Sequence, residues 1–211
     1  SSGQSEYRVE WANNSSFTGS TDFLTTSSSN ISYSWPTPLT DGTWYWHAKQ
    51  KDAAGNWSVY STAWSFNVDT AAPTSNSISI SGTASPGNGG SYTSTTSVTL
   101  TLASTGASQM RFKNESGGTW TSYESYSTSK SWTLGSGDGT KTVYAQFKDA
   151  AGNVATAVTD TITLDTAAPT SNSISIAGGA DYTTSTSVTL TLGSTGASQM
   201  RFKNESGGTY T

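Results

Sequence analysis

Long internal repeats are the feature of this sequence that most constrains its fold. Residues 69–80 recur at 165–176, 96 positions later, and residues 105–119 recur unchanged at 195–209, 90 positions later. A third motif, Asp-Ala-Ala-Gly-Asn, occupies residues 52–56 and again 149–153, 97 positions later. A period of 90–97 residues is too long for a solenoid repeat and matches one β-sandwich domain. The repeats therefore predict sandwich domains in tandem.

The positions of the repeats predict three domains. Residues 1–72 form the first, residues 73–168 a complete second, and residues 169–211 a partial third. The shorter 90-residue offset reflects a Pro/Gly-rich insertion at residues 85–90, and loops accept such insertions at low cost. Because the first domain starts late in its pattern and the third stops early, we expect the sequence to be a segment of a longer array.

Hydrophobic alternation predicts an all-β chain of antiparallel sandwiches joined by short linkers. Apolar and polar residues alternate strictly over residues 97–102 and 187–192, which is typical of half-buried strands. Shorter alternating pairs follow: Ile78 with Ile80, Met110 with Phe112, Val143 with Ala145 and Phe147, and Ile162 with Leu164. No window has a helical period, and turn residues recur every 8–12 positions or so, as expected for a sandwich.

The repeated polar motifs have the chemistry of turns and connections. In Asp-Ala-Ala-Gly-Asn the aspartate caps a hairpin turn, and the glycine supplies the positive φ that closes it. In Asp-Thr-Ala-Ala-Pro, residues 69–73 and 165–169, the proline fixes φ and holds the preceding alanine extended. Connections this short predict a semi-rigid array.

The composition points to a core built from a few large side chains. Hydrophobic residues make up 32% of the chain and charged residues 11%, while tryptophan occurs eight times. Six tryptophans fall in the first domain, among them Trp11, Trp44, Trp46, Trp57 and Trp64. They either fill the core or form an exposed platform that stacks on sugar rings. The core is favoured, because this domain has few aliphatic residues.

The first domain resembles a bacterial fibronectin type III domain. The resemblance is carried by residues 7–11 (YRVEW), 39–46 (LTDGTWYW), 51–58 (KDAAGNWS) and 64–69 (WSFNVD). The other two resemble bacterial Ig-like domains of large surface adhesins, on the motifs at residues 138–140, 149–153 and 165–169. These resemblances imply an extracellular or cell-surface location.

The side chains that face inward in residues 42–52 depend on the alignment used. The fibronectin resemblance implies that Tyr45 is a tyrosine-corner residue, which would turn Tyr45 and His47 inward. A gapless alignment of the two domains instead pairs Trp46 with Val143 and turns Trp46 inward. The second alternative is favoured, because Tyr45 aligns with a threonine.

Several function classes find no support in the sequence. His47 is the only histidine and lies in a predicted strand, no G-x-S-x-G motif occurs, and acidic residues fall mostly in repeated turns and linkers. The chain is therefore predicted not to be an enzyme, and no cofactor is required. A net charge of −4 with no basic cluster argues against nucleic acid, and no apolar run is long enough to span a membrane.

Calcium is the one ligand that the polar motifs suggest. Related adhesin repeats hold calcium at domain junctions, and by resemblance the ligands here are Asp52, Asn56, Asp69, Asp149, Asn153 and Asp165. Hard cations need several oxygen ligands. The alternative is that the same side chains only cap turns, which their positions already explain.

Three functions are compatible with these observations. The first is a structural and adhesive segment of a long bacterial surface protein or filament, whose partners are copies of the same chain, a host or cell surface, or a polysaccharide. The second is an accessory spacer or carbohydrate-binding module of a secreted polysaccharide-degrading enzyme. The third is a decoration of a phage or virion surface.

Overall fold

The computed structural model describes residues 4–18, 22–27, 38–84 and 91–204, and their regular structure is β-strand apart from one short turn of 3-10 helix. The predicted all-β fold is confirmed. No helix among these residues has the length and apolar character needed to cross a membrane. The insertion at residues 85–90 lies outside the described residues. The chain divides into two compact units, residues 1–72 with Asp149–Val154, and Pro73–Lys148 with Ala155–Thr211. The three-domain division stays a prediction.

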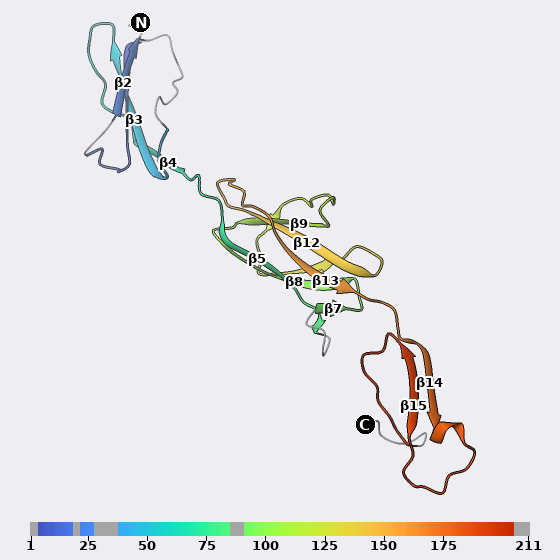
Figure 1. The fold of residues 1–211 in the computed structure, drawn as a ribbon. Coiled ribbons are helices and arrows are strands. Elements are labelled where there is room, and N and C mark those ends of the chain that lie inside the picture. The colour runs from blue at the N-terminus through green and yellow to red at the C-terminus, as the bar shows by residue number, and fades with distance from the viewer. Residues whose placement is uncertain (1–3, 19–21, 28–37, 85–90, 205–211) are drawn as a thin grey trace. The chain divides into compact units, whose positions relative to one another are not determined.

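The first unit contains one antiparallel sheet in the order β2-β1-β3-β4 (Figure 1). Its strands are β1 (Gln4–Ala12), β2 (Asp22–Ser27), β3 (Gly42–Asp52) and β4 (Trp64–Val68). In the antiparallel pairing of β1 with β3, Trp11 lies opposite Trp46 and Glu10 lies opposite His47. Because strand side chains alternate between faces, Trp46 shares a face with Trp11 and His47 occupies the other face. Residues 44–49 of β3 are half-buried on both faces, so which face lies inward stays a prediction.

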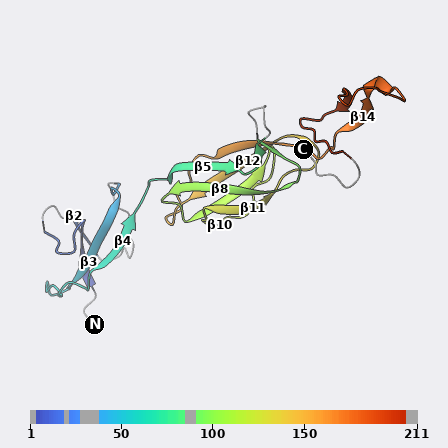
Figure 2. The ribbon, with the colours of Figure 1, turned by 90° about the horizontal axis from the view of Figure 1, so that it is seen from below.

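Strands β5 to β13 form a two-sheet sandwich, which we call the sandwich. One sheet has the order β11-β8-β5 and the other β10-β9-β12-β13-β7-β6; Figure 2 shows β5, β8 and β11 side by side. The strands are β5 (Thr74–Ile80), β6 (Thr83–Ala84), β7 (Ser91–Thr93), β8 (Ser97–Thr105), β9 (Gln109–Asn114), β10 (Glu124–Ser125), β11 (Ser129–Thr133), β12 (Gly139–Lys148) and β13 (Val158–Leu164). The β13–β7 pair is parallel, which the sequence did not predict.

The core of the sandwich lies between its two sheets. Alternate residues of β8 and β12 point inward, so Leu100 and Val143 are fully buried while their neighbours along the strands are more exposed. Phe112 and Phe147 are the largest fully buried side chains. At about 25 cal/mol per Å² of apolar area removed from water, such side chains contribute most of the free energy that stabilises the sandwich.

The remaining regular elements are β14 (Thr170–Ile176), the turn η1 (Ala177–Gly179) and β15 (Leu190–Thr195). We call the antiparallel β14–β15 pair the C-terminal hairpin. The strand predicted at residues 187–192 begins only at Leu190. In the sandwich the equivalent residues 97–99 pair with β11, and the described part of the hairpin has no such third strand.

Candidate functional site

The two Asp-Ala-Ala-Gly-Asn loops, from which calcium binding was predicted, fold as nearly identical turns. In the first, Asp52 Oδ1 accepts hydrogen bonds from the amides of Ala54 (2.9 Å) and Asn56 (2.8 Å), and Asp52 Oδ2 accepts one from Asn56 Nδ2 at 3.1 Å. In the second, Asp149 Oδ1 accepts from two backbone amides at 2.7 and 2.8 Å, and Oδ2 from Asn153 Nδ2 at 2.9 Å. Gly55 and Gly152 have φ of 92° and 104°, as predicted for the closing position.

These bonds favour the ionised form of both carboxyl groups. Hydrogen bonds from the Asn56 backbone and side chain hold the pKa of Asp52 below its ordinary value. At Asp149, burial disfavours the charge, but bonds from Asn153 and neighbouring amides outweigh burial, and the pKa is again lowered. Each aspartate therefore closes its loop as an anion.

The linker aspartates have a comparable local role. Asp69 Oδ1 accepts from the amide of Ala71 at 3.1 Å, and Asp165 Oδ1 accepts from Ala167 at 3.0 Å. The next linker residue is tied back to its own domain by another aspartate. Asp41 Oδ1 accepts from both the amide and the hydroxyl of Thr70, and Asp138 makes the same two bonds with Thr166.

This geometry does not supply a dense set of free oxygen ligands. The structure brings Asp52 to Asn56 and Asp149 to Asn153, but both oxygens of each carboxylate already accept hydrogen bonds from the loop. Within the described residues, no three His, Cys, Asp or Glu side chains are grouped as a metal ion would require. Turn capping accounts for the loop and linker bonds, and calcium binding at the six residues stays a prediction.

A different constellation covers the outer face of β9 and β12 in the sandwich, and we call it the sandwich ladder. Six side chains alternate between aromatic and cationic: Tyr144, Lys113, Trp120, Arg111, Tyr123 and Lys148. Each cationic group lies 4.1–5.2 Å from the centre of every ring next to it. All six side chains are half-buried. Contacts of this kind are worth about 0.5–1 kcal/mol each at exposed sites.

Neutral groups hold the cations of the sandwich ladder in place. Gln146 Oε1 accepts from Arg111 Nε at 2.9 Å and from Nη2 at 2.5 Å, while Gln146 Nε2 donates to the Ala155 carbonyl. Lys113 Nζ donates to the Ser116 carbonyl at 2.6 Å. Among the described residues, no carboxylate forms an ion pair with Arg111, Lys113 or Lys148. The ladder therefore keeps three positive charges, although the chain as a whole is negative.

The first unit carries a comparable stack on the face of β1 and β3 that includes Glu10 and His47, and we call it the first-unit ladder. Its six members are Phe17, His47, Tyr60, Lys49, Trp57 and Lys51. His47 lies between two parallel rings, with centroids at 3.8 and 3.9 Å, and the two lysines lie 4.5–5.5 Å from the neighbouring ring centres. The two ladders thus share their position on the sheet and their alternation.

Carboxylates accompany the first-unit ladder. Glu10 Oε2 lies 2.8 Å from His47 Nε2, Glu10 also lies 3.6 Å from Arg8, and Glu6 pairs with Lys51 at 3.2 Å. Burial disfavours the Glu10 charge, but hydrogen bonds from His47 and Tyr60 and the Arg8 charge hold its pKa below the ordinary value. Burial and the bond to Glu10 raise the pKa of Tyr60. This ladder is electrically compensated, and the sandwich ladder is not.

The ladders correct two expectations from the sequence. The first-unit tryptophans do not all fill a core: Trp11 is buried and Trp44 and Trp46 are half-buried, but Trp57 and Trp64 are 38% and 65% exposed. The expectation of no basic cluster was also wrong. Arg111 and Lys148 are 37 positions apart, and antiparallel pairing of β9 with β12 brings their strands together. The only local signal was the alternation of Arg111, Phe112 and Lys113, which places both cations on one face.

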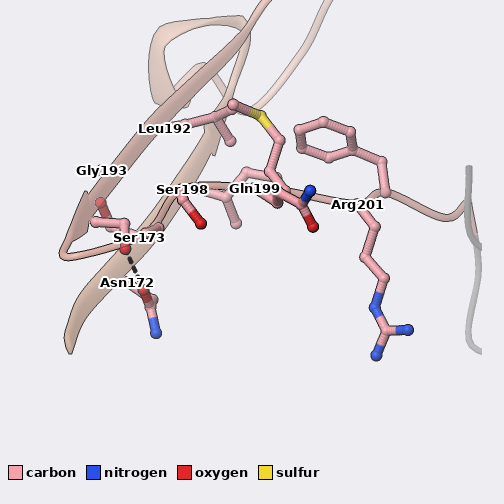
Figure 3. A pocket seen from close by; sticks show the side chains of 12 residues that line it. Asn172, Ser173, Leu192, Gly193, Ser198, Gln199 and Arg201 are labelled. Carbon is pink, nitrogen blue, oxygen red and sulfur yellow. Dashed lines mark hydrogen bonds between the residues drawn. The ribbon is translucent and has the colours of Figure 1, made fainter. Parts of the chain in front are cut away.

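A pocket of about 620 Å³ lies in the C-terminal hairpin (Figure 3). It is lined by β14, β15 and residues 197–202, including Ile174, Leu192, Met200 and Phe202. The repeat equivalents of these four belong to or pack against the sandwich core: Ile78, Leu102, Met110 and Phe112. The pocket thus lies on the face of the hairpin that corresponds to the core-facing side of β5 and β8, and Asn172, Gln199 and Arg201 are among its polar lining residues.

Comparisons with known proteins give no family assignment. No family model matches the sequence, and none of the curated proteins matches it. Two similar solved structures are fibronectin domains: the FN1–FN3 domains of chicken CNTN1 (10% identity, TM-score 0.44) and fibronectin(III)-like modules of Clostridium thermocellum CbhA (16%, 0.39). Each covers 77% of this chain, which in turn spans 56% of the chicken chain and 79% of the bacterial one. With TM-scores below 0.5, neither likeness carries a functional argument.

Proposed function

We propose that this chain is a non-enzymatic structural and adhesive repeat segment of a long extracellular bacterial surface protein or filament. The observation that supports this most is the repetition of the same polar bonds in two domains. Asp52 and Asp149 close the same loop, and Asp41 and Asp138 hold the same linker threonine. Residues that recur with the same structural bonds serve the architecture of each domain.

The linker bonds bear directly on a spacer role. In each connection the threonine is hydrogen-bonded to its own domain, and three residues later comes a proline whose ring fixes φ. Few residues are therefore left to rotate freely between one domain and the next. Such a connection supports a semi-rigid array, in which the domains set the distance between whatever lies at its two ends.

Small-angle X-ray scattering of the 211-residue chain tests the array. A compact protein of this length has a radius of gyration of about 17 Å. We expect a clearly larger value and an interatomic distance distribution with a long tail. Replacing Asp138 with alanine should broaden that distribution by freeing Thr166, whereas Lys130→Gln, distant in sequence from the linker, should leave it unchanged. A radius near 17 Å for the unaltered chain would overturn the proposal.

A second candidate function is an accessory carbohydrate-binding module of a secreted polysaccharide-degrading enzyme. The exposed side chain of Trp64 favours it, because sugar rings stack on exposed aromatic side chains. The two candidates differ in what the whole protein contains. A catalytic domain in the same open reading frame would favour the accessory module, and further repeats of this kind would favour the surface array.

Calcium binding is proposed as an additional property of the loops and linkers. If Asp149, Asn153 and Asp165, with their first-unit counterparts, hold calcium, millimolar calcium should raise the melting temperature above that in chelator. Magnesium is the matched control, because it demands stricter octahedral geometry. Equal melting temperatures in calcium and chelator would leave turn capping as the only role of these residues.

A further inference from the structure

We propose that the sandwich ladder is a binding site for a linear acidic polysaccharide, a polymer whose sugar rings carry carboxylates. The proposal adds a ligand to the structural role above and does not depend on that role. It starts from the order of side chains on the outer face of β9 and β12, where three rings and three cations alternate without interruption. Because the cations lie over the ring faces, the ladder offers a ligand its row of positive charges, and a polyuronate carries one carboxylate on each sugar to meet them.

The uncompensated positive charge of the sandwich ladder distinguishes it from the first-unit ladder. Cation–ring contacts occur in both ladders and stabilise both. They are therefore not evidence for a ligand, and the two ladders differ instead in their charge. In the first unit, Glu6 and Glu10 lie among the cations. In the sandwich, the partners of Arg111 and Lys113 are an amide oxygen and a carbonyl oxygen. The three positive charges therefore remain available to an anion from solution.

The ladder is also held in a defined geometry before any ligand arrives. The guanidinium of Arg111 lies between Trp120 and Tyr123, 4.8 and 4.7 Å from the ring centres, and Gln146 fixes its Nε edge. Arg111 has five N–H donors, and Gln146 takes two of them, so the guanidinium retains donors for a carboxylate. Fixing these side chains in advance lowers the entropy that binding must cost.

The density of charge favours a polysaccharide over a nucleic acid. Duplex DNA carries about one charge per 1.7 Å, and its affinity for proteins rests on many phosphate contacts at once. The ladder offers three cations separated by rings, on a chain with a net charge of −4. A polymer with one carboxylate per sugar has the sparser charge that such spacing suits.

The repeat preserves the elements of the ladder. The sequence around Arg111 and Lys113 recurs unchanged around Arg201 and Lys203, and the position of Trp120 is taken by Tyr210, which is also aromatic. The structure of Tyr210 lies outside the described residues. At the level of sequence, however, two cations and one ring recur in successive repeats, as a polymer-binding array would require. Several weak sites in tandem raise the overall affinity without new contacts.

Binding of the 211-residue chain to sodium polygalacturonate, measured by affinity electrophoresis and calorimetry, tests the proposal. We expect retardation that weakens as salt is raised, and at least a tenfold loss of affinity in Trp120→Ala and in the double variant Arg111→Gln/Lys113→Gln. Trp120→Tyr, which restores a ring, should stay within about threefold of the parent. Matched controls are Lys130→Gln in the sandwich and Lys51→Gln in the first-unit ladder, both ion-paired in the parent, and neither should change affinity.

Three outcomes would overturn the proposal. Equal binding of fully methyl-esterified polygalacturonate, which has no carboxylates, would show that the ladder does not recognise the charge of the polymer. In the second outcome, dextran sulfate or duplex DNA binds as tightly as polygalacturonate and Trp120→Ala has no effect. Binding would then be non-specific attraction of any polyanion to the positive charges. No retardation of the folded parent, with circular dichroism intact, would remove the site altogether. Failure here leaves the scattering result unaffected, so the two proposals stand or fall separately.

Discussion

The β5–β8 pair of the sandwich and the C-terminal hairpin have nearly the same sequence and different surroundings. Both first strands read TSNSISI, and both pairs share one register, in which Ile78 faces Leu102 and Ile174 faces Leu192. Both have a register shift after the first threonine, next to a serine with φ of 52° or 56°. The side-chain bond from Ser104 to Asn76, at 2.6 Å, recurs from Ser194 to Asn172 at 2.7 Å.

The β5–β8 pair and the C-terminal hairpin differ in how far their apolar side chains are buried. Ile80, Leu100 and Leu102 are 4%, 0% and 3% exposed, whereas their equivalents in the hairpin, Ile176, Leu190 and Leu192, are 55%, 37% and 42% exposed. The sandwich covers its pair with β9, β12 and β13. Register, bulge and local hydrogen bonds are therefore encoded within about 30 residues of chain, while burial depends on strands that arrive later in the sequence.

The largest expected effect follows from this difference in burial. Leu100→Ala should lower the free energy of unfolding of the sandwich by about 2–5 kcal/mol, because it leaves a cavity in a closed core. Leu190→Ala should cost less than about 1 kcal/mol, because Leu190 already meets solvent. Hydrogen-exchange mass spectrometry resolves peptides from β8 and β15 within one sample. Equal losses of protection would contradict the burial seen here.

Completing the hairpin should remove the difference. A second copy of residues 122–168, fused after Thr211, would supply counterparts of β11, β12 and β13. Leu190→Ala in that longer chain should then cost within about 1 kcal/mol of Leu100→Ala, since both leucines would line a closed core. Fusing an equally long Gly/Ser linker is the control, and it should leave the cost of Leu190→Ala unchanged. If the true extension also had no effect, the hairpin would not be the start of a sandwich.

The shared asparagine bonds should show a smaller contrast. Asn76→Ala removes the bonds to Ser104 and to the Pro73 carbonyl, at a half-buried position, and should cost about 1–2 kcal/mol. Asn172→Ala removes equivalent bonds at an exposed position and should cost about 0.5 kcal/mol. Denaturant melts measure both, with the exposed Ser79→Ala as a neutral control. A larger cost at Asn172 would mean that local bonds, not burial, govern the hairpin.

The smallest expected effect is the dependence on acid pH that Asp149 gives to the stability of the sandwich. The pKa of Asp149 is lowered on folding, so its contribution is present above the unfolded value of about 3.9 and is lost as pH falls through the folded pKa. Asp149→Asn should lower the melting temperature at pH 7 and flatten its fall below about pH 4. Asp181→Asn, at an exposed position between β14 and β15, is the control and should leave the melting temperature at pH 7 unchanged.

Much of the fold could be predicted because its signals are local. The strict alternation at residues 97–102 marks β8, and the glycines of the two Asp-Ala-Ala-Gly-Asn loops have the predicted positive φ. The parallel β13–β7 pair could not be predicted, because β7 has three residues and lies 65 positions before β13. The roles of Trp57 and Trp64 were missed because composition shows how many rings a domain has, and not which face each ring occupies.

By itself, the sequence determined the tandem repeat, the strand alternation, the turn chemistry and the aspartates that close the Asp-Ala-Ala-Gly-Asn loops. Each of these depends on residues close together in the chain, where backbone geometry and short hydrogen bonds leave few alternatives. The tertiary structure alone decided which copy of a repeated pair is buried and where charge gathers. Arg111 and Lys148 become members of one ladder only when β9 pairs with β12, and no carboxylate of the described residues pairs with either. Burial and local charge depend on which residues lie close together in space, and many of those residues are far apart in the sequence.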